Sequence, residues 1–324
     1  MKDFNHDSTG VEVVNEFADR VQGKTIVITG ASVNGLGAGT AISLAHGNPA
    51  HLILLARSQS RVDPVINKIA EINPKIKVTF VAVSLDDFDS ARSAAQTIST
   101  AVDKVDILIN NAGVMAFNEY TTNKNGIESQ LATNHLGHFV FTKYLLPKIL
   151  AAGPGARIVN LSSLGHTLSP FRFDDYNFSN GATYDPWTAY GQSKTANILF
   201  SVSLADKLRD KNVAVYAVHP GNIYTTNLGS HLQGDFVALI DHLKDISRKN
   251  TGRDFPINTE TPKSPEQGVS TTLVAALDPR IEDKSGSYLV DGNVAEPYEH
   301  ASDKENAERL WKLSEQLVGE EFEI

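Results

Sequence analysis

The stretch KTIVITGASVNGLG, residues 24–37, runs from a short apolar segment into a turn that holds three glycines. The apolar part predicts a buried strand, and the residues from Leu36 onward predict a helix. Glycines between a strand and a helix let the phosphates of a dinucleotide approach the helix N-terminus. We therefore predict a nucleotide-binding turn at Gly30, Gly35 and Gly37, although such turns also serve as plain connections.

Strand-like and helix-like segments alternate along the rest of the chain. The strand candidates are short, almost entirely apolar and rich in β-branched residues, as expected of strands buried on both faces. They lie at 25–29, 51–56, 77–83, 106–110, 156–162, 213–218 and 285–290. Longer amphipathic segments separate them, at 36–47, 62–73, 89–102, 128–150 and 188–210. This alternation predicts an α/β fold: a single Rossmann-like, doubly wound parallel sheet with helices on both faces.

We predict one catalytic, dinucleotide-binding domain for the whole chain, 1–324, because this length suits one large core with appendages. Residues 1–23 are expected to form an N-terminal helical extension. Residues 297–324 are expected to carry a C-terminal helix packed on the outside.

Two connecting segments, 164–187 and 222–263, should border the reaction site, because ligands of open α/β sheets bind beyond the carboxyl ends of the strands. The first carries six aromatic residues, which either line the substrate mouth or anchor the loop. The second contains an apolar helical face made of Phe236, Leu239, Ile240 and Leu243. This face either packs on the domain or closes over an apolar substrate, and we predict that 222–263 is a substrate lid.

Composition argues against several classes of partner. The formal net charge of -9 argues against nucleic acid, which normally binds a basic face. The chain has no cysteine, and its ten histidines form no metal-binding pattern, so we expect no metal. No window approaches the roughly 20 apolar residues of a membrane span, and the N-terminus MKDFNHDSTG lacks the apolar core of a signal peptide. A cytoplasmic location is therefore expected.

The end of the second strand indicates which dinucleotide binds. An acidic residue at this position holds the adenosine 2′-hydroxyl of NAD, whereas an arginine accommodates the 2′-phosphate of NADP. The sequence here reads LLARSQSR, residues 54–61, with Ala56 in the acidic position and Arg57 and Arg61 after it. NADP(H) is therefore the predicted cofactor. The alternative is that both arginines are ordinary solvated side chains.

The segment TAYGQSK, residues 188–194, indicates acid–base chemistry. Tyr190 and Lys194 are four residues apart in a predicted helix, so they share one face. A nearby positive charge favours the phenolate and makes a tyrosine more useful as an acid or base. Taken alone, such a pair is more often an ordinary surface pair.

Six motifs, in order, resemble those of the short-chain dehydrogenase/reductase family. They are TGASVNGLG (29–37), NNAG (110–113), NHLGHF (134–139), RIVNLSS (157–163), YGQSK (190–194) and HPGNIYT (219–225). The sequence around these motifs is similar to that of the retinol dehydrogenase-like branch of the family. The terminal segments resemble those of fungal reductases of that branch. The resemblance implies oxidation or reduction of an alcohol or carbonyl group.

The resemblance also implies a role for each catalytic candidate. Tyr190 would donate a proton to the substrate carbonyl or accept one in reverse, and Lys194 would hold the nicotinamide ribose and depress the tyrosine pKa. Ser163 would hydrogen-bond the substrate oxygen. Its rival is Ser162, because strand alternation lets only one of two adjacent side chains face the site. Asn134 would bend its helix and hold a water of the proton relay, or would merely cap or bend the helix.

His135 and His138 are expected to be packed or solvated rather than catalytic. The implied cofactor contacts are Gly30, Ser32, Asn34, Gly35, Leu36, Gly37, Arg57, Ser84, Leu85, Asn111, Ala112, Gly113, Tyr190, Lys194, Pro220, Gly221, Ile223 and Thr225. Three features depart from the family pattern, one of which is the unusually long connection from Ser163 to Tyr190. The glycine turn has one additional residue, and Ser84 stands where the family usually has an aspartate that binds adenine.

The predicted function is an NADPH-dependent carbonyl reductase or alcohol dehydrogenase for a ketone, aldehyde or alcohol, with a hydrophobic substrate expected. The alternative is a non-catalytic NADP(H)-binding regulatory protein. The intact set of Ser163, Tyr190 and Lys194 argues against that alternative, because a sensor needs no proton donor. The resemblance also allows a homodimer in which the long helices that carry Asn134 and Tyr190 pair between subunits.

Overall fold

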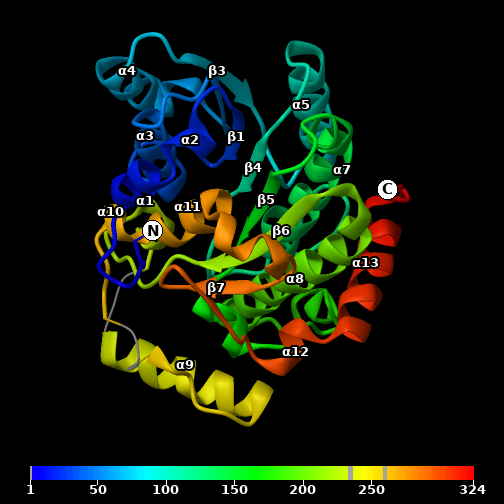
Figure 1. Cartoon of the computed structure of the whole chain (residues 1–324). Coiled ribbons are helices and arrows are strands. Elements are labelled where there is room, and N and C mark those ends of the chain that lie inside the picture. Colours follow the sequence, from blue (N-terminus) through cyan, green and yellow to red (C-terminus); the bar gives the residue numbers. More distant parts are fainter. Residues whose placement is uncertain (1, 233–235, 258–260) are drawn as a thin grey trace.

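The computed structural model describes residues 2–232, 236–257 and 261–324, and within them a single sheet of eight strands runs through the molecule (Figure 1). The strand order is β3-β2-β1-β4-β5-β6-β7-β8, and only the last pair is antiparallel. The strands are β1 (Thr25–Thr29), β2 (His51–Ala56), β3 (Lys77–Ala82), β4 (Ile107–Asn110), β5 (Ala156–Leu161), β6 (Val213–His219), β7 (Tyr288–Val290) and β8 (Asn293–Ala295).

Helices connect the strands and flank both termini. The α-helices are α1 (Gly10–Glu16), α2 (Ala18–Val21), α3 (Leu36–Ala45), α4 (Asp63–Ile72), α5 (Phe88–Ala101), α6 (Ser129–Leu131), α7 (Gly137–Leu150), α8 (Pro186–Lys207), α9 (Phe236–Thr251), α10 (Pro265–Gly268), α11 (Ser270–Leu277), α12 (Glu299–Ser302) and α13 (Lys304–Val318). A π-helical segment, Ala132–Leu136, joins α6 to α7, and a 3-10 helix, Leu164–Leu168, follows β5.

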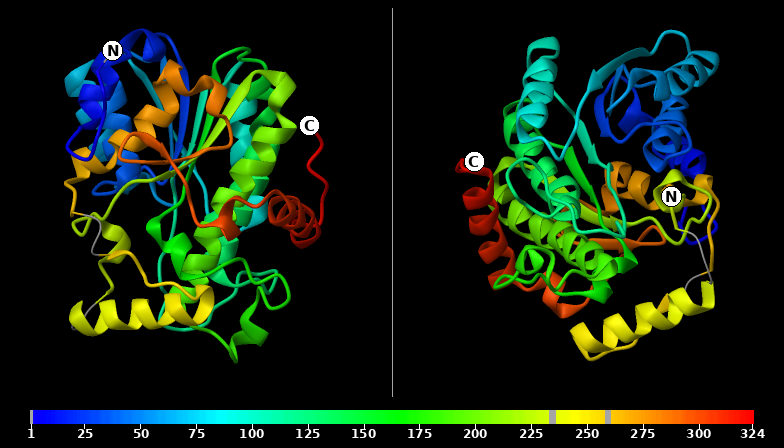
Figure 2. Two further views of the ribbon diagram at one scale, coloured as in Figure 1. Left: turned by 60° about the horizontal axis from the view of Figure 1, so that its bottom comes forward. Right: turned by 180° about the vertical axis from the view of Figure 1, so that it is seen from behind.

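Alternate residues of the central strands are buried against two different helical layers. In β1, Ile26 and Ile28 pack in a cluster with residues of α1, α3, α4 and α11. Val27 points to the other face, where α5, α7 and α8 supply the cluster. Figure 2, left, shows the sheet between these two layers. The predicted doubly wound fold is therefore confirmed, and each of the seven predicted strands is present.

β8 was not predicted, because it is only three residues long and its central residue, Val294, is 43% exposed. So short a segment carries no recognisable alternation of apolar and polar residues. β8 pairs with β7 and forms the edge of the sheet.

The C-terminal helix α13 covers the two long helices α7 and α8. The ring of Trp311 lies 5.1 Å from Phe139 of α7 and 5.9 Å from Phe200 of α8, and Phe322 stacks on Trp311 at 4.9 Å. Such aromatic contacts stabilise the packing of helices by more than the buried apolar area alone would. This face of α7 and α8 is therefore covered by α13, and the pairing of these helices between subunits, which the resemblance allows, stays a prediction.

Within the described part of the chain, no helix combines the length and apolar character needed to cross a bilayer.

Candidate active site

A cleft of about 1220 Å³ opens beyond the carboxyl ends of the parallel strands. Five of the six family-like motifs contribute to its lining, with Gly30 after β1, Asn111 after β4, Ser163 after β5, Tyr190 in α8 and Pro220 after β6. Parallel strands bring their carboxyl ends to one edge of the sheet, so residues far apart in sequence meet there.

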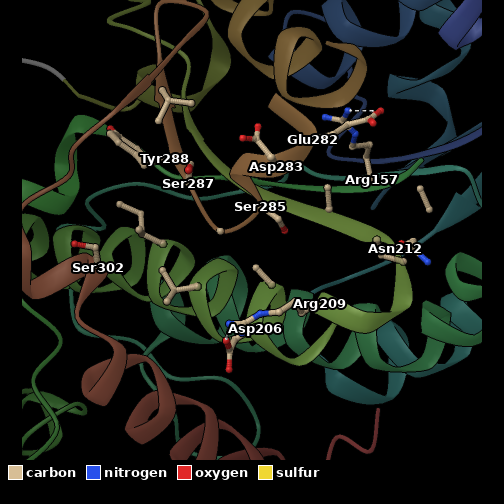
Figure 3. A pocket seen from close by; sticks show the side chains of 18 of the residues that line it. Arg157, Asp206, Arg209, Asn212, Glu282, Asp283, Ser285, Ser287, Tyr288 and Ser302 are labelled. Carbon is tan, nitrogen blue, oxygen red and sulfur yellow. Dashed lines mark hydrogen bonds and ion pairs between the residues drawn. The ribbon is translucent and has the colours of Figure 1, made fainter. Parts of the chain in front are cut away.

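A second cavity of about 710 Å³ lies at the other end of the sheet, beside the first residues of β5 and β6 (Figure 3). Its charged residues largely pair with one another. Arg157 contacts Glu282, as Figure 3 shows, and also donates to the carbonyl oxygen of Ala275 in α11 at 3.0 Å. In the part of the chain that the structure describes, none of the predicted site residues lines this cavity.

The position of Tyr190 and Lys194 follows from where α8 begins. The Asp185 carboxylate accepts a hydrogen bond from the N–H of Thr188 at 2.7 Å, and Pro186 occupies the first turn. Both features favour a helix start at this point. The motif therefore falls early in α8, and both side chains line the cleft.

Tyr190 and Lys194 are close to each other and deeply buried. The Lys194 Nζ lies 5.6 Å from the centre of the Tyr190 ring and donates to the carbonyl oxygen of Leu161 at 3.1 Å. Each side chain belongs to a residue that is only 4% exposed. Tyr190 and Lys194 thus lie side by side as predicted, and the last residue of β5 accepts a hydrogen bond from the ammonium.

Burial controls the ionisation of both groups. It raises the pKa of Tyr190 to about 12, against the opposing effect of the hydrogen bond with Ser163, and it lowers the pKa of Lys194 to about 8. We expected the pKa of Tyr190 to be depressed, whereas in this structure it is raised. Loss of hydration around the phenolate outweighs the hydrogen bond with Ser163. At neutral pH Tyr190 therefore keeps its proton.

The two adjacent serines at the end of β5 have different partners. Ser162 donates its hydroxyl proton to the backbone carbonyl of Lys194 at 2.8 Å. The Ser163 hydroxyl accepts a hydrogen bond from the N–H of Gly165 at 3.0 Å and also hydrogen-bonds Tyr190. Because Ser163 accepts from Gly165, its own proton remains available to an oxygen at the site.

Asn134 lies in the π-helical segment and is fully buried. Its amide oxygen accepts from the N–H of Val114 at 2.8 Å, and its amide nitrogen donates to the Val114 carbonyl at 2.9 Å and to the Ser193 hydroxyl at 2.9 Å. A helix interrupted by a π-helical turn is frequent at functional sites. Asn134 is therefore set behind the cleft lining, where it clamps the backbone after the NNAG motif.

The glycine turn leaves no room for side chains at two positions. A Cβ on Gly30, where φ is 72°, would lie 2.7 Å from the Cα of Ala112, and one on Gly37 would lie 2.5 Å from the Gly30 carbonyl oxygen. No side chain caps the first turn of α3, which begins after Gly35, so its N–H groups can meet an anion. These features fit a dinucleotide pyrophosphate.

The additional residue of the turn is accommodated at Asn34. Its φ of 63° is left-handed, a conformation that asparagine tolerates better than most residues. Its carbonyl accepts from the N–H of Asn227 at 3.3 Å. Asn34 is exposed and does not line the cleft, whereas Gly30, Ser32, Gly35 and Leu36 do.

The far end of the cleft holds the residues after β2 and β3. Arg57 and Arg61 both line it and are exposed, and within the described residues neither forms an ion pair with an acidic side chain. Ser84 donates its hydroxyl proton to Asp86 at 2.6 Å. Asp86 also lines the cleft, so a carboxylate stands two residues after the position where the family usually has one.

The loop after β6 contributes to the cleft differently from the motif's prediction. Pro220, Gly221 and Ile223 line the cleft, as do Leu85, Ala112 and Gly113 from the other loops. Thr225 is exposed and lies outside the lining, while its neighbours Tyr224 and Thr226 belong to it. The structure therefore does not bring Thr225 to the other predicted contacts.

The α9 helix both packs on the domain and borders the cleft. In Figure 2 it stands at one end of the molecule, beyond the sheet and its layers. Leu243 and Ile246 are buried in a cluster with Leu164 and Leu168 of the 3-10 helix. Leu239, Ile240 and Leu243 also line the cleft. The side chain of Phe236, which we placed on the same face, lies outside the described part of the chain.

Several cleft residues were not named from the sequence. They come from loops and include Met115, Phe117, Asn118, Asn222, Leu228, His231, Leu232, Phe255 and Ile257. Of the six aromatic residues in the segment 164–187, Trp187, in the first turn of α8, lines the cleft, with its ring 6.1 Å from that of Tyr190 and perpendicular to it. The only signal in the sequence for Met115 was its place in the loop after β4. Across the described residues, no three or more His, Asp or Glu side chains are grouped to hold a metal ion.

Residues 24–235 match the family model described as short chain dehydrogenase. The protein belongs to the short-chain dehydrogenase family. It is therefore an oxidoreductase for alcohol or carbonyl groups, in a family that binds a nicotinamide cofactor.

Individual relatives extend the similarity to most of the chain. The chain is 36% identical over 299 residues to retinol dehydrogenase 13 of Homo sapiens, covering 92% of this chain and 86% of that protein. It is 32% identical over 243 residues to oxidoreductase fscI of Fusarium equiseti, covering 67% and 94%. A crystal structure of an uncharacterized protein from Mycobacterium Paratuberculosis has a TM-score of 0.69 and 30% identity, covering 95% and 98%. The predicted resemblance, including its retinol dehydrogenase-like branch, is confirmed.

Proposed function

We propose that this protein is an NADP(H)-dependent carbonyl reductase or alcohol dehydrogenase for hydrophobic ketones, aldehydes or alcohols. The observation that carries the proposal is the hydrogen bond between Ser163 and Tyr190 in the cleft, beside the ammonium of Lys194. A buried phenol that keeps its proton at neutral pH is suited to act as a general acid towards a carbonyl oxygen.

The residues of the cleft fit a dinucleotide. The pyrophosphate would lie at the uncapped start of α3, over the glycine turn, where a Cβ at Gly30 or Gly37 would clash. Arg57 and Arg61, which lack acidic partners among the described residues, support NADP(H) over NAD(H). When bound, the nicotinamide supplies or accepts the hydride.

The chain's own residues then manage the oxygen and its proton. In the reducing direction Tyr190 protonates the carbonyl oxygen, and Ser163 donates a hydrogen bond to the same oxygen. Lys194 supports proton transfer through its charge and would bind the nicotinamide ribose. Asn134 keeps the backbone after Gly113 in place through its two bonds to Val114. In the oxidising direction Tyr190 accepts the proton.

The cleft wall supports an apolar substrate. Its apolar residues that form one cluster are Leu164, Leu168, Trp187, Leu239, Ile240, Leu243, Phe255 and Ile257. We keep the segment 222–263 as the proposed lid, because α9 contributes part of this wall. The two ends of the segment are joined, since the N–H of Lys263 donates to the carbonyl of Asn222 at 2.9 Å. A relative named as a retinol dehydrogenase agrees with a hydrophobic substrate.

One domain over residues 1–324, a cytoplasmic location and a homodimer also remain proposals. A homodimer would have to use a surface other than the face of α7 and α8 that α13 covers. Light scattering on the purified chain decides its oligomeric state.

A screen of NADPH consumption across aliphatic, aromatic and polycyclic carbonyl compounds tests the proposed function. We expect turnover with bulky apolar carbonyls and slower turnover when NADH replaces NADPH. Tight NADPH binding without turnover of any carbonyl or alcohol would instead support the non-catalytic regulatory protein.

A further inference from the structure

His138 connects two parts of the cleft floor that are distant in sequence. It lies in α7, four residues after Asn134, and is 2% exposed. Its Nδ1 lies 3.0 Å from the carbonyl oxygen of Asn134, and its Nε2 lies 2.9 Å from the hydroxyl of Thr29 at the end of β1. The imidazole therefore spans the gap between the π-helical segment and the strand that leads into the glycine turn.

The partners of Thr29 determine which nitrogen of His138 carries the proton. The Thr29 hydroxyl oxygen accepts from the N–H groups of Asn111 and Ala112, both at 3.0 Å. Its single proton is then left for the Nε2 of His138, so the Nδ1 carries the ring proton and donates to Asn134. Burial lowers the pKa of His138 to about 4, with a further contribution from the charge of Lys194, so the ring is neutral at pH 7.

His138 contacts the backbone carbonyl of Asn134, and the side chain of Asn134 lies close to Lys194 of the proposed acid–base pair. A Cβ on Gly113 would lie 3.2 Å from the Asn134 amide oxygen and 3.5 Å from the Lys194 Nζ, so both atoms flank one spot. Asn134 also donates to the Ser193 hydroxyl, which in turn donates to the Tyr190 carbonyl at 2.8 Å. A displacement of Asn134 would therefore reach Lys194 and the backbone of Tyr190.

We propose that His138 is a positioning residue, which through its hydrogen bonds to Thr29 and the Asn134 carbonyl fixes the surroundings of Lys194 for proton transfer. This inference rests on the proposed function. The regular hydrogen bonding of the helix changes at the π-helical segment, and the side chain of His138 supplies a donor to the Asn134 carbonyl there. His138 itself is not among the residues that line the cleft.

His135 provides a matched control. It is also a buried histidine, three residues earlier, but its Nε2 faces the Ser314 hydroxyl of α13 at 2.8 Å. His138→Phe keeps an aromatic ring and removes both hydrogen bonds. His138→Asn keeps a donor close to the position of Nδ1. His135→Phe also replaces a buried histidine by an aromatic ring, but at a position whose side chain contacts α13 and not β1.

Steady-state kinetics with a carbonyl found in the screen separates positioning from a purely structural role. His138→Phe should lower kcat by about 10²-fold, the cost of a small misplacement at a reacting centre, while KM and the NADPH dissociation constant stay unchanged. His138→Phe should also shift the alkaline limb of the pH profile of kcat. His138→Asn should have a kcat close to that of the unmodified protein. His135→Phe should lower the melting temperature without changing kcat.

A wild-type kcat in His138→Phe, or an equal loss of kcat in His135→Phe, would overturn the inference. Absence of turnover in the unmodified protein would instead refute the proposed function. Nuclear magnetic resonance of ring-¹⁵N-labelled protein tests the geometry without activity, with the signal assigned by its loss in His138→Asn. We expect a neutral ring protonated at Nδ1, and protonation at Nε2 would overturn the inference even if His138→Phe fails to fold.

Discussion

The burial of Lys194 predicts that carbonyl reduction slows in alkaline solution. Its pKa is lowered to about 8, whereas that of Tyr190 is raised to about 12, so the lysine loses its charge first as the pH rises. If the charge of Lys194 is needed, each pH unit above about 8 should lower kcat about tenfold, in proportion to the remaining ammonium. Tyr190 stays protonated throughout this range and does not contribute to the decline.

Initial rates of NADPH consumption, measured with saturating substrate from about pH 6 to pH 10, give this profile directly. Lys194→Arg is the informative variant, because a guanidinium keeps its charge over this whole pH range. Its residual activity should show no decline near pH 8. A flat profile for the unmodified protein up to about pH 10, or an unchanged limb in Lys194→Arg, would refute the role assigned to the buried ammonium.

Three further predictions concern the serine, the cofactor and the lid. Ser163→Ala should lower kcat by about 10²-fold through loss of a donor to the carbonyl oxygen, and Ser162→Ala should lower kcat less. A larger loss of kcat in Ser162→Ala than in Ser163→Ala would show that Ser162 contacts the substrate oxygen. Arg57→Asp should narrow or invert the preference for NADPH in fluorescence binding assays, because a carboxylate repels the 2′-phosphate; equal NADPH and NADH dissociation constants in the unmodified protein would contradict this. Leu239→Ala should raise KM for polycyclic carbonyls with little change in melting temperature, whereas Ile246→Ala should cost about 2–5 kcal/mol of stability and leave KM alone; a large stability loss in Leu239→Ala with unchanged KM would make that face core packing.

The sheet could be predicted from sequence because its signal is local. β1 and β2 are short, largely apolar runs, and β1 is made entirely of β-branched residues; burial on both faces leaves few other structures for such runs. The alternation with helices indicated a parallel, doubly wound sheet. β8 could not be found in this way, because Val294 and its neighbours are too few and too exposed to show a pattern.

Parts of the site depend on tertiary structure and escaped prediction. The pKa of Tyr190 was expected to fall, but its direction depends on how fully the fold removes water from the phenol. The family resemblance implied Thr225, yet Thr225 is exposed and its neighbours Tyr224 and Thr226 line the cleft instead. The contact of His138 with Thr29 joins residues 109 positions apart, and no local pattern announces it.

The most direct test of the central claim compares Tyr190→Phe with Tyr216→Phe, which removes another buried hydroxyl, one that donates to the Ile281 carbonyl far from the cleft lining. The measurement is kcat with a reactive carbonyl, together with the NADPH dissociation constant of each variant. The account predicts that Tyr190→Phe loses about 10²- to 10⁴-fold in kcat with NADPH binding intact, while Tyr216→Phe keeps its turnover. Unchanged turnover in Tyr190→Phe would show that the proton comes from another group.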